Sequence, residues 1–104
     1  MSEQEVIDNL IMGITGISDV QKIVLFGSRA RGDNRFDSDY DILVVKNTNE
    51  PKYKRASKYY RNLANLPCEV EIVVYTPDEI REWANVSQAF ITTALNEGKL
   101  LYEH

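Results

Sequence analysis

Cysteine, histidine and long apolar runs are scarce in this chain. Its 104 residues include one cysteine, Cys68, and one histidine, His104. The sequence therefore excludes an intrachain disulfide and a zinc site built from several cysteines. No apolar run approaches the roughly 18 residues of a membrane span, and no basic-then-apolar signal pattern stands at the start. We therefore expect a cytoplasmic protein that does not insert into a membrane.

An excess of basic residues is also missing. The chain has 12 Lys and Arg against 16 Asp and Glu, which gives a formal net charge of -4. Surfaces that bind duplex nucleic acid usually carry a basic excess that neutralises phosphates, so nucleic acid is an unlikely main partner. The composition, 43% hydrophobic and 27% charged, is typical of a globular protein, and the length predicts a single domain over 1–104.

The first quarter of the chain predicts a helix followed by a central strand. Ser2 with Glu5 three residues later forms a capping box, and apolar residues then recur at helical spacing. Residues 20–26 follow, and their last four residues are all apolar. A strand that is apolar on both faces is typical of the centre of a sheet.

The rest of the chain alternates between strand and helix patterns. It predicts strands over 39–45, 69–75 and 99–102, a helix beginning at Pro51, a helix beginning at Thr76 and a helix over 87–96. In the Pro51 helix we expect Tyr60 to face the core and Arg55 to face solvent. No long helical pattern separates the first two strands, so they should pair as an antiparallel hairpin. The predicted fold class is α/β (α+β), with helices packed on a small mixed sheet.

The stretch from the first strand to the second carries the most informative residues. The apolar strand stops at Gly27-Ser28, and after a polar segment Asp39-x-Asp41 opens a second apolar strand. Residues two apart in a strand face the same side, so Asp39 and Asp41 should point together, about 7 Å apart along the chain. Two like charges aimed at one place suggest that a cation binds between them.

Two familiar ion-binding and phosphate-binding motifs do not fit this stretch. Gly27 and Gly32 have the spacing of a P-loop, but the next two residues are not the Lys and Ser or Thr that this motif requires. A calcium-binding EF-hand loop starting at Asp37 would need Gly and Glu where Ile42 and Thr48 stand. Both readings therefore fail.

The order Gly-Ser, ten residues, Asp-x-Asp resembles the nucleotidyltransferase superfamily of the DNA polymerase β type. The form found here is similar to the minimal nucleotidyltransferases, small prokaryotic proteins typically paired with a helical HEPN partner. The resemblance extends over nearly the whole chain, and it implies the palm fold of polymerase β-like nucleotidyltransferases. The motifs that carry it are Gly27-Ser28-x-Ala30-Arg31-Gly32, Ser38-Asp39-x-Asp41-Ile42-Leu43-Val44, the segment 71–79 and the segment 94–103.

The resemblance implies transfer of a nucleoside monophosphate from a triphosphate to a hydroxyl, with pyrophosphate leaving. Asp39 and Asp41 would bridge two Mg²⁺ ions, which stabilise the attacking and leaving oxygens. The family usually has a third Asp at the head of the next strand, where this sequence has Glu71. Glu71 is therefore the candidate that completes the metal site and takes the proton of the attacking hydroxyl, with Glu69 as the alternative.

The same resemblance predicts the contacts of the nucleotide triphosphate. Gly27 lets the backbone approach the phosphates, and the Ser28 hydroxyl can donate to phosphate oxygens. Arg29 and Arg31 could neutralise the β and γ phosphates. Ser38, in the second half of the motif, is the remaining predicted nucleotide contact, and the family implies ATP as the donor.

Three functions are compatible with these residues. In the first, a Mg²⁺-dependent enzyme moves AMP from ATP to a tyrosine hydroxyl of a HEPN-domain toxin and so acts as its antitoxin, as the resemblance implies. In the second, the protein neutralises the same partner by binding alone, because Glu71 in place of Asp weakens the metal site. In the third, a stand-alone nucleotidyltransferase modifies a small hydroxyl substrate such as an antibiotic.

Overall fold

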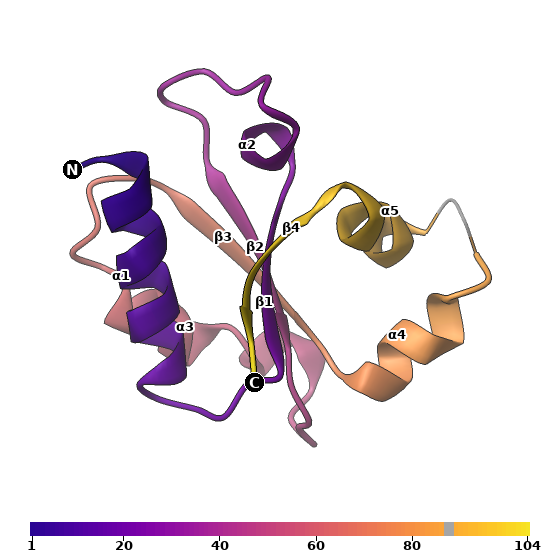
Figure 1. Ribbon diagram of the computed structural model, residues 1–104. Helices are drawn as coiled ribbons and strands as arrows, with labels where there is room; N and C mark the ends of the chain where they lie inside the picture. The colour runs from indigo at the N-terminus through magenta and orange to yellow at the C-terminus, as the bar shows by residue number, and fades with distance from the viewer. Residues whose placement is uncertain (87–88) are drawn as a thin grey trace.

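A four-stranded sheet forms the centre of the computed structural model, which describes residues 1–86 and 89–104. Helices pack on both faces of this sheet (Figure 1). The elements in chain order are α1 (Glu3–Thr15), β1 (Lys22–Phe26), α2 (Ser28–Arg31), β2 (Tyr40–Val45), the 3₁₀ turn η1 (Lys52–Lys54), α3 (Ser57–Asn62), β3 (Val70–Tyr75), α4 (Pro77–Trp83), α5 (Phe90–Glu97) and β4 (Lys99–Glu103).

The strands lie in the order β3-β2-β1-β4. β1 pairs antiparallel with both β2 and β4, whereas β2 pairs parallel with β3 through the connection that contains η1 and α3. The predicted mixed sheet, the antiparallel pairing of the first two strands and the edge position of the last strand are confirmed. The first strand begins at Lys22, slightly later than predicted.

The two faces of the sheet bury different clusters. α1 and α3 cover one face, and α4 and α5 cover the other (Figure 1). On the first face, Leu10 and Ile14 of α1 pack with Ile42 and Val44 of β2. Because side chains alternate along a strand, the residues between these on β2 face α5, where Leu43 joins the second cluster. Asp41 and Glu71 fall on this second face.

The helix predicted from Pro51 is divided into two short pieces, η1 and α3. Within α3 the fully buried aromatic ring belongs to Tyr59, and the prediction that Tyr60 faces the core was wrong. Tyr60 lies at the edge of the core instead, where its hydroxyl accepts a hydrogen bond from the Ile72 backbone N–H at 2.7 Å. Ala56 and Leu63, which lie on the same predicted face, do contact the core, so the prediction was wrong in which of the two neighbouring tyrosines is buried.

The break in this helix coincides with a buried arginine. Arg55, predicted on the solvent side, is only 7% exposed. Its guanidinium donates to the Glu50 carbonyl at 2.8 Å, to the Val74 carbonyl at 3.1 Å and to both carboxylate oxygens of Glu79 at 2.7 and 3.2 Å. Partners from distant parts of the chain therefore decide the orientation of this segment.

Glu79 anchors the start of α4 in two ways. It accepts the Thr76 backbone N–H in a capping box and also pairs with Arg55. The hydrogen bonds from Arg55 lower the pKa of Glu79 from 4.5 to about 2. The ion pair therefore holds α4 against the end of β3, on the face that carries Asp41.

Two further observations concern the predicted helices. The helix expected over 87–96 is observed from Phe90, and its first two residues lie outside the described residues. Among the helices that the structure describes, none has the length and apolar character needed to cross a membrane.

Glu79→Gln should destabilise the protein at neutral pH and have little effect in strong acid. The folded-state pKa of Glu79 lies below 4.5, so its stabilising contribution is present above pH 4.5 and is lost as the pH falls toward 2. We expect a loss of about 2 kcal/mol in the free energy of unfolding at pH 7. Urea unfolding at pH 7 and pH 2.5 measures it, with the exposed Glu82→Gln on the same helix as the control. An equal loss at both pH values would contradict this assignment.

Candidate functional site

Gly27, which directly follows β1, lies against the carboxylate of Asp41. The antiparallel register pairs Phe26 with Asp41, so the next residue of the chain passes over the Asp41 side chain. Gly27 has φ +73° and ψ −157°, a backbone conformation that is essentially restricted to glycine. A Cβ at this position would overlap Oδ2 of Asp41. Backbone geometry and available space therefore both require glycine here.

The structure brings the three predicted carboxylates to one end of the sheet, where β2 and β3 begin. Asp41 of β2 is the register partner of Glu71 in β3, and Asp39 immediately precedes β2. Asp41 is half-buried, whereas Asp39 and Glu71 are exposed. Burial raises the pKa of Asp41, and the negative charges of Glu71 and Asp39 raise it further. The three side chains thus form a strongly negative site.

The chemistry of this site suits a divalent cation. Carboxylate oxygens are the ligands that Mg²⁺ prefers, and a bound cation would stabilise the ionised form of Asp41, whose pKa is raised by burial and then by repulsion from Glu71 and Asp39. Within residues 1–86 and 89–104, no group of three carboxylate, histidine or cysteine side chains is already gathered closely enough to hold an ion. The exposed side chains of Asp39 and Glu71 would therefore have to rotate toward Asp41 to share one.

Arg29 organises the loop that leads to Asp39. Its side chain is buried, with its guanidinium 4.0 Å from the centre of the Tyr40 ring. It donates to the backbone carbonyls of Ser38 at 2.9 Å and Phe36 at 3.0 Å. This arrangement does not favour the predicted contact between Arg29 and phosphate, because these donors already hold the loop in place.

Arg31 and Ser38, the other predicted contacts on this segment, occupy different settings. Arg31 is exposed and pairs with Asp33 at 3.2 Å and with Glu97 of α5 at 3.3 Å. These pairs raise its pKa, and its exposure leaves the side chain free to exchange them for another anion. The Ser38 hydroxyl accepts the Arg35 backbone N–H at 2.9 Å, so in this structure it closes a turn of the loop.

Ser28 begins α2 directly after the Gly27 turn. The Gly27 carbonyl accepts the backbone N–H groups of Ala30 and Arg31, both at 3.1 Å, which fixes the direction of this short helix. Ser28 is half-buried and stands next to the residue that covers Asp41. Its predicted phosphate contact stays a prediction, and its position beside the carboxylates is compatible with it.

The structure places an aromatic pair beside Asp41 that was not among the site residues predicted from the sequence. Phe26, the register partner of Asp41, packs edge to face on Phe90 of α5, with ring centres 5.4 Å apart and an interplanar angle of 88°. The sequence marks Phe26 only as an apolar strand residue and Phe90 only as part of a helical pattern. No local signal could have brought the two rings together.

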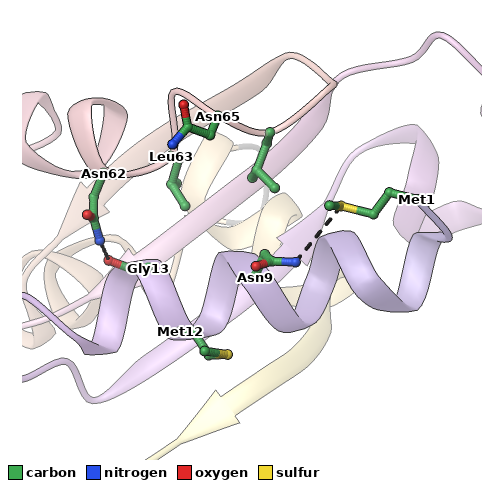
Figure 2. Close-up of a pocket in the computed structure, with 8 residues that line it drawn as sticks. Met1, Asn9, Met12, Gly13, Asn62, Leu63 and Asn65 are labelled. Atoms are coloured by element: carbon green, nitrogen blue, oxygen red, sulfur yellow. Dashed lines mark hydrogen bonds between the residues drawn. The ribbon is translucent and has the colours of Figure 1, made fainter.

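A pocket of about 380 Å³ lies between α1 and α3, on the other face of the sheet (Figure 2). Asn62 closes one end by donating to the Gly13 carbonyl at 2.6 Å, and Asn9 donates to the Met1 sulfur at 3.9 Å. Among the eight described residues that line it, none has a charged side chain. The pocket is therefore separate from the carboxylate site in both position and chemistry.

Comparison with known proteins gives one family and several relatives. The profile of a family described as "Polymerase beta, Nucleotidyltransferase" matches residues 9–104. A proposed protein adenylyltransferase of Methanocaldococcus jannaschii is 34% identical over 86 residues, which cover 80% of this chain and 79% of the relative. These residues include the whole Gly27 to Glu71 region.

Two solved structures share the fold. One is the crystal structure of a toxin–antitoxin with AMP-PNP, which has a TM-score of 0.66 and 22% identity and covers 99% of this chain and 75% of that one. The other is a proposed nucleotidyltransferase from Sulfolobus solfataricus, with a TM-score of 0.62, 20% identity and coverage of 97% and 86%. At these identities the likeness is one of fold.

Gly27→Ala should damage both stability and the site. The new methyl group would meet Asp41 and the backbone would be strained, so we expect a loss of about 3 kcal/mol. Gly32→Ala is the matched control, because Gly32 also has a positive φ, of +84°, but has open space around its Cβ position. It should cost only about 1 kcal/mol. Chemical denaturation of both variants tests this, and equal losses would contradict the proposed contact with Asp41.

Asp41→Asn should raise the melting temperature of the magnesium-free protein at neutral pH. The folded-state pKa of Asp41 is raised, so the ionised form disfavours folding above that pKa, and a neutral amide of the same shape removes this effect. Thermal unfolding in EDTA measures the change, with the exposed Asp37→Asn as the control. A lower melting temperature for Asp41→Asn than for wild type would contradict this account of the site.

Proposed function

Because this chain belongs to the polymerase β-type nucleotidyltransferase family, we propose that it moves AMP from ATP to a hydroxyl of a partner toxin protein and thereby acts as an antitoxin. The observation that carries the proposal is the half-buried Asp41 carboxylate beneath Gly27, with Asp39 and Glu71 beside it. A nucleotidyltransferase needs carboxylates that bind metal ions and, beside them, a backbone segment that a nucleoside triphosphate can approach closely.

The predicted site residues have separate roles in the proposed reaction. Asp39, Asp41 and Glu71 would hold Mg²⁺, two ions by analogy with the family, which when bound neutralise charge on the phosphates and on the attacking oxygen. Gly27 brings the backbone at the start of α2 close to Asp41, where a triphosphate could approach it, and Ser28 can donate to the phosphate oxygens. Arg31 can exchange its partners Asp33 and Glu97 for phosphate oxygens, because all three side chains are solvent-accessible.

The transfer step is a displacement at the α-phosphorus. The acceptor oxygen forms a bond to the α-phosphorus while the bond from that phosphorus to the oxygen bridging to the β-phosphorus breaks, and pyrophosphate leaves. The proton of the acceptor hydroxyl passes to a carboxylate, for which exposed Glu71 is the proposed acceptor. An exposed base at the edge strand β3 is accessible to a hydroxyl carried by another protein.

The choice of a protein acceptor rests on the relatives. One relative is described as a proposed protein adenylyltransferase, and one structural neighbour is a toxin–antitoxin with AMP-PNP. We propose in addition that the partner is a HEPN-domain toxin, that the modified group is a tyrosine hydroxyl and that the reaction takes place in the cytoplasm. These three proposals rest on the resemblance between this sequence and the minimal nucleotidyltransferases.

A binding antitoxin without transferase activity is the second candidate. Glu71 stands where the family usually has Asp, its longer side chain is exposed, and among the described residues Asp39, Asp41 and Glu71 are not gathered as a set of three. Magnesium requires a nearly octahedral set of ligands, so a misplaced carboxylate lowers its affinity. This candidate predicts the same partner with no change in the partner's mass.

Intact mass of the co-expressed partner toxin separates the two candidates. With wild-type protein the partner should gain the mass of one or more AMP units, and with the Asp39→Ala/Asp41→Ala variant it should gain none. Asp37→Ala, a nearby exposed carboxylate outside the pair, should leave the modification unchanged. A partner that stays bound and inhibited without any gain in mass would overturn the enzymatic proposal in favour of binding alone.

A further inference from the structure

A second cavity, of about 250 Å³, lies on the same face of the sheet as the carboxylates. α4, α5 and the end of β3 form it, with η1 at its rim. Its lining residues are Lys52, Tyr75, Trp83, Ala89, Phe90 and Ile91. Trp83 is 44% exposed and Phe90 is 50% exposed. Two large aromatic side chains therefore remain accessible here.

Two observations place the cavity near the carboxylate site. Tyr75 lies four residues after Glu71 on the same face of β3, which separates their Cα atoms by about 13 Å. Phe90 packs on Phe26, and Phe26 is the register partner of Asp41. The distance along β3 is one that a nucleotide spans between its α-phosphorus and the far edge of its base.

The chemistry of the lining suits a flat, polar aromatic ring. Trp83 and Phe90 offer half-exposed ring surfaces, and base–aromatic stacking is a strong and sequence-tolerant interaction. The Lys52 ammonium lies 4.5 Å from the centre of the Tyr75 ring, where it can donate to nitrogen or oxygen acceptors at a base edge. The volume is below the roughly 300 Å³ at which pockets hold a whole drug-sized ligand, so it fits one part of a nucleotide.

We propose that this cavity holds the base of the nucleoside triphosphate whose phosphates reach Gly27 and Asp41. The inference rests on the proposed function and adds a base-binding subsite to it, with Phe90, Trp83 and Lys52 as the residues that bind the base. A purine presents more ring surface than a pyrimidine, so the cavity favours purine nucleotides.

The aromatic acceptor side chain is a less suitable occupant. A tyrosine whose hydroxyl reaches Glu71 keeps its ring within one side-chain length of Glu71, whereas Tyr75 of the cavity lies about 13 Å further along β3. In a nucleotide the ribose separates the base from the α-phosphorus and bridges that gap. The position of the cavity therefore favours the donor nucleotide over the acceptor.

The single tryptophan of the chain, Trp83, provides a direct readout. We expect Mg²⁺-ATP to change the fluorescence of Trp83 on titration, whereas tripolyphosphate, which lacks a base, should bind without changing it. Binding of both ligands is measured independently by calorimetry. A fluorescence change of equal size with tripolyphosphate would overturn the assignment, because that ligand has nothing to place in the cavity.

Substitutions of residues that line the cavity test the base-binding assignment by their effect on the affinity for ATP. Phe90→Ala should weaken ATP binding about tenfold and leave tripolyphosphate binding unchanged. Lys52 is exposed, so Lys52→Ala should not disturb folding. This variant should also bind ATP more weakly while its affinity for tripolyphosphate stays unchanged. Phe36→Ala is the matched control, because this side chain is 96% exposed and lies outside the cavity lining.

The outcomes separate this inference from the proposed function. If ATP and tripolyphosphate both bind wild type, and neither Phe90→Ala nor Lys52→Ala changes the affinity for ATP, the base lies elsewhere and the inference is wrong while the function stands. If neither ligand binds wild type in the presence of Mg²⁺, the proposed function fails and this inference fails with it.

Discussion

The close approach of Gly27 to Asp41 is the contact on which the rest of the site depends. It follows from the antiparallel register of β1 and β2, which pairs Phe26 with Asp41 and directs the next residue over the carboxylate. The same register leaves Asp41 half-buried, so that its charge is poorly solvated and its pKa is raised. A poorly solvated carboxylate is unfavourable for folding, and the Gly27 backbone conformation, with φ +73°, excludes every residue but glycine; both features are typical of a site shaped by function.

The surrounding elements hold this unfavourable contact in place. β2 is paired on both sides, with β1 and with β3, and the parallel pairing places Glu71 beside Asp41. Buried Arg29 fixes the loop before β2 through two backbone carbonyls, which limits the positions open to Asp39. The predicted catalytic carboxylates thus depend on a residue that the sequence had suggested for phosphate binding.

The carboxylate group could be predicted from the sequence because it depends on local rules. Alternation along a strand places Asp39 and Asp41 on one side, whereas Glu71 was selected through the resemblance to the family, which usually has Asp at this position. The role of Arg55 could not be predicted in this way, because its partner Glu79 lies 24 residues away and only the tertiary fold brings them together. The aromatic cavity depends likewise on how α4 and α5 pack against β3. Sequence periodicity gives the direction of a side chain only relative to its own element.

Titration of the isotopically labelled protein with Mn²⁺ in the presence of AMP-PNP shows whether a divalent cation binds beside Gly27 and Asp41, because this paramagnetic ion broadens the NMR signals of nearby nuclei. We expect substoichiometric Mn²⁺ to broaden first the backbone amide signals of Gly27, Asp41 and Glu71, and we expect Asp41→Asn to remove this effect. Signals at the far end of the sheet, such as that of Tyr102, should stay sharp. Broadening centred on the acidic first turn of α1, with Gly27 and Asp41 unaffected, would contradict the placement of the cation site at Asp41.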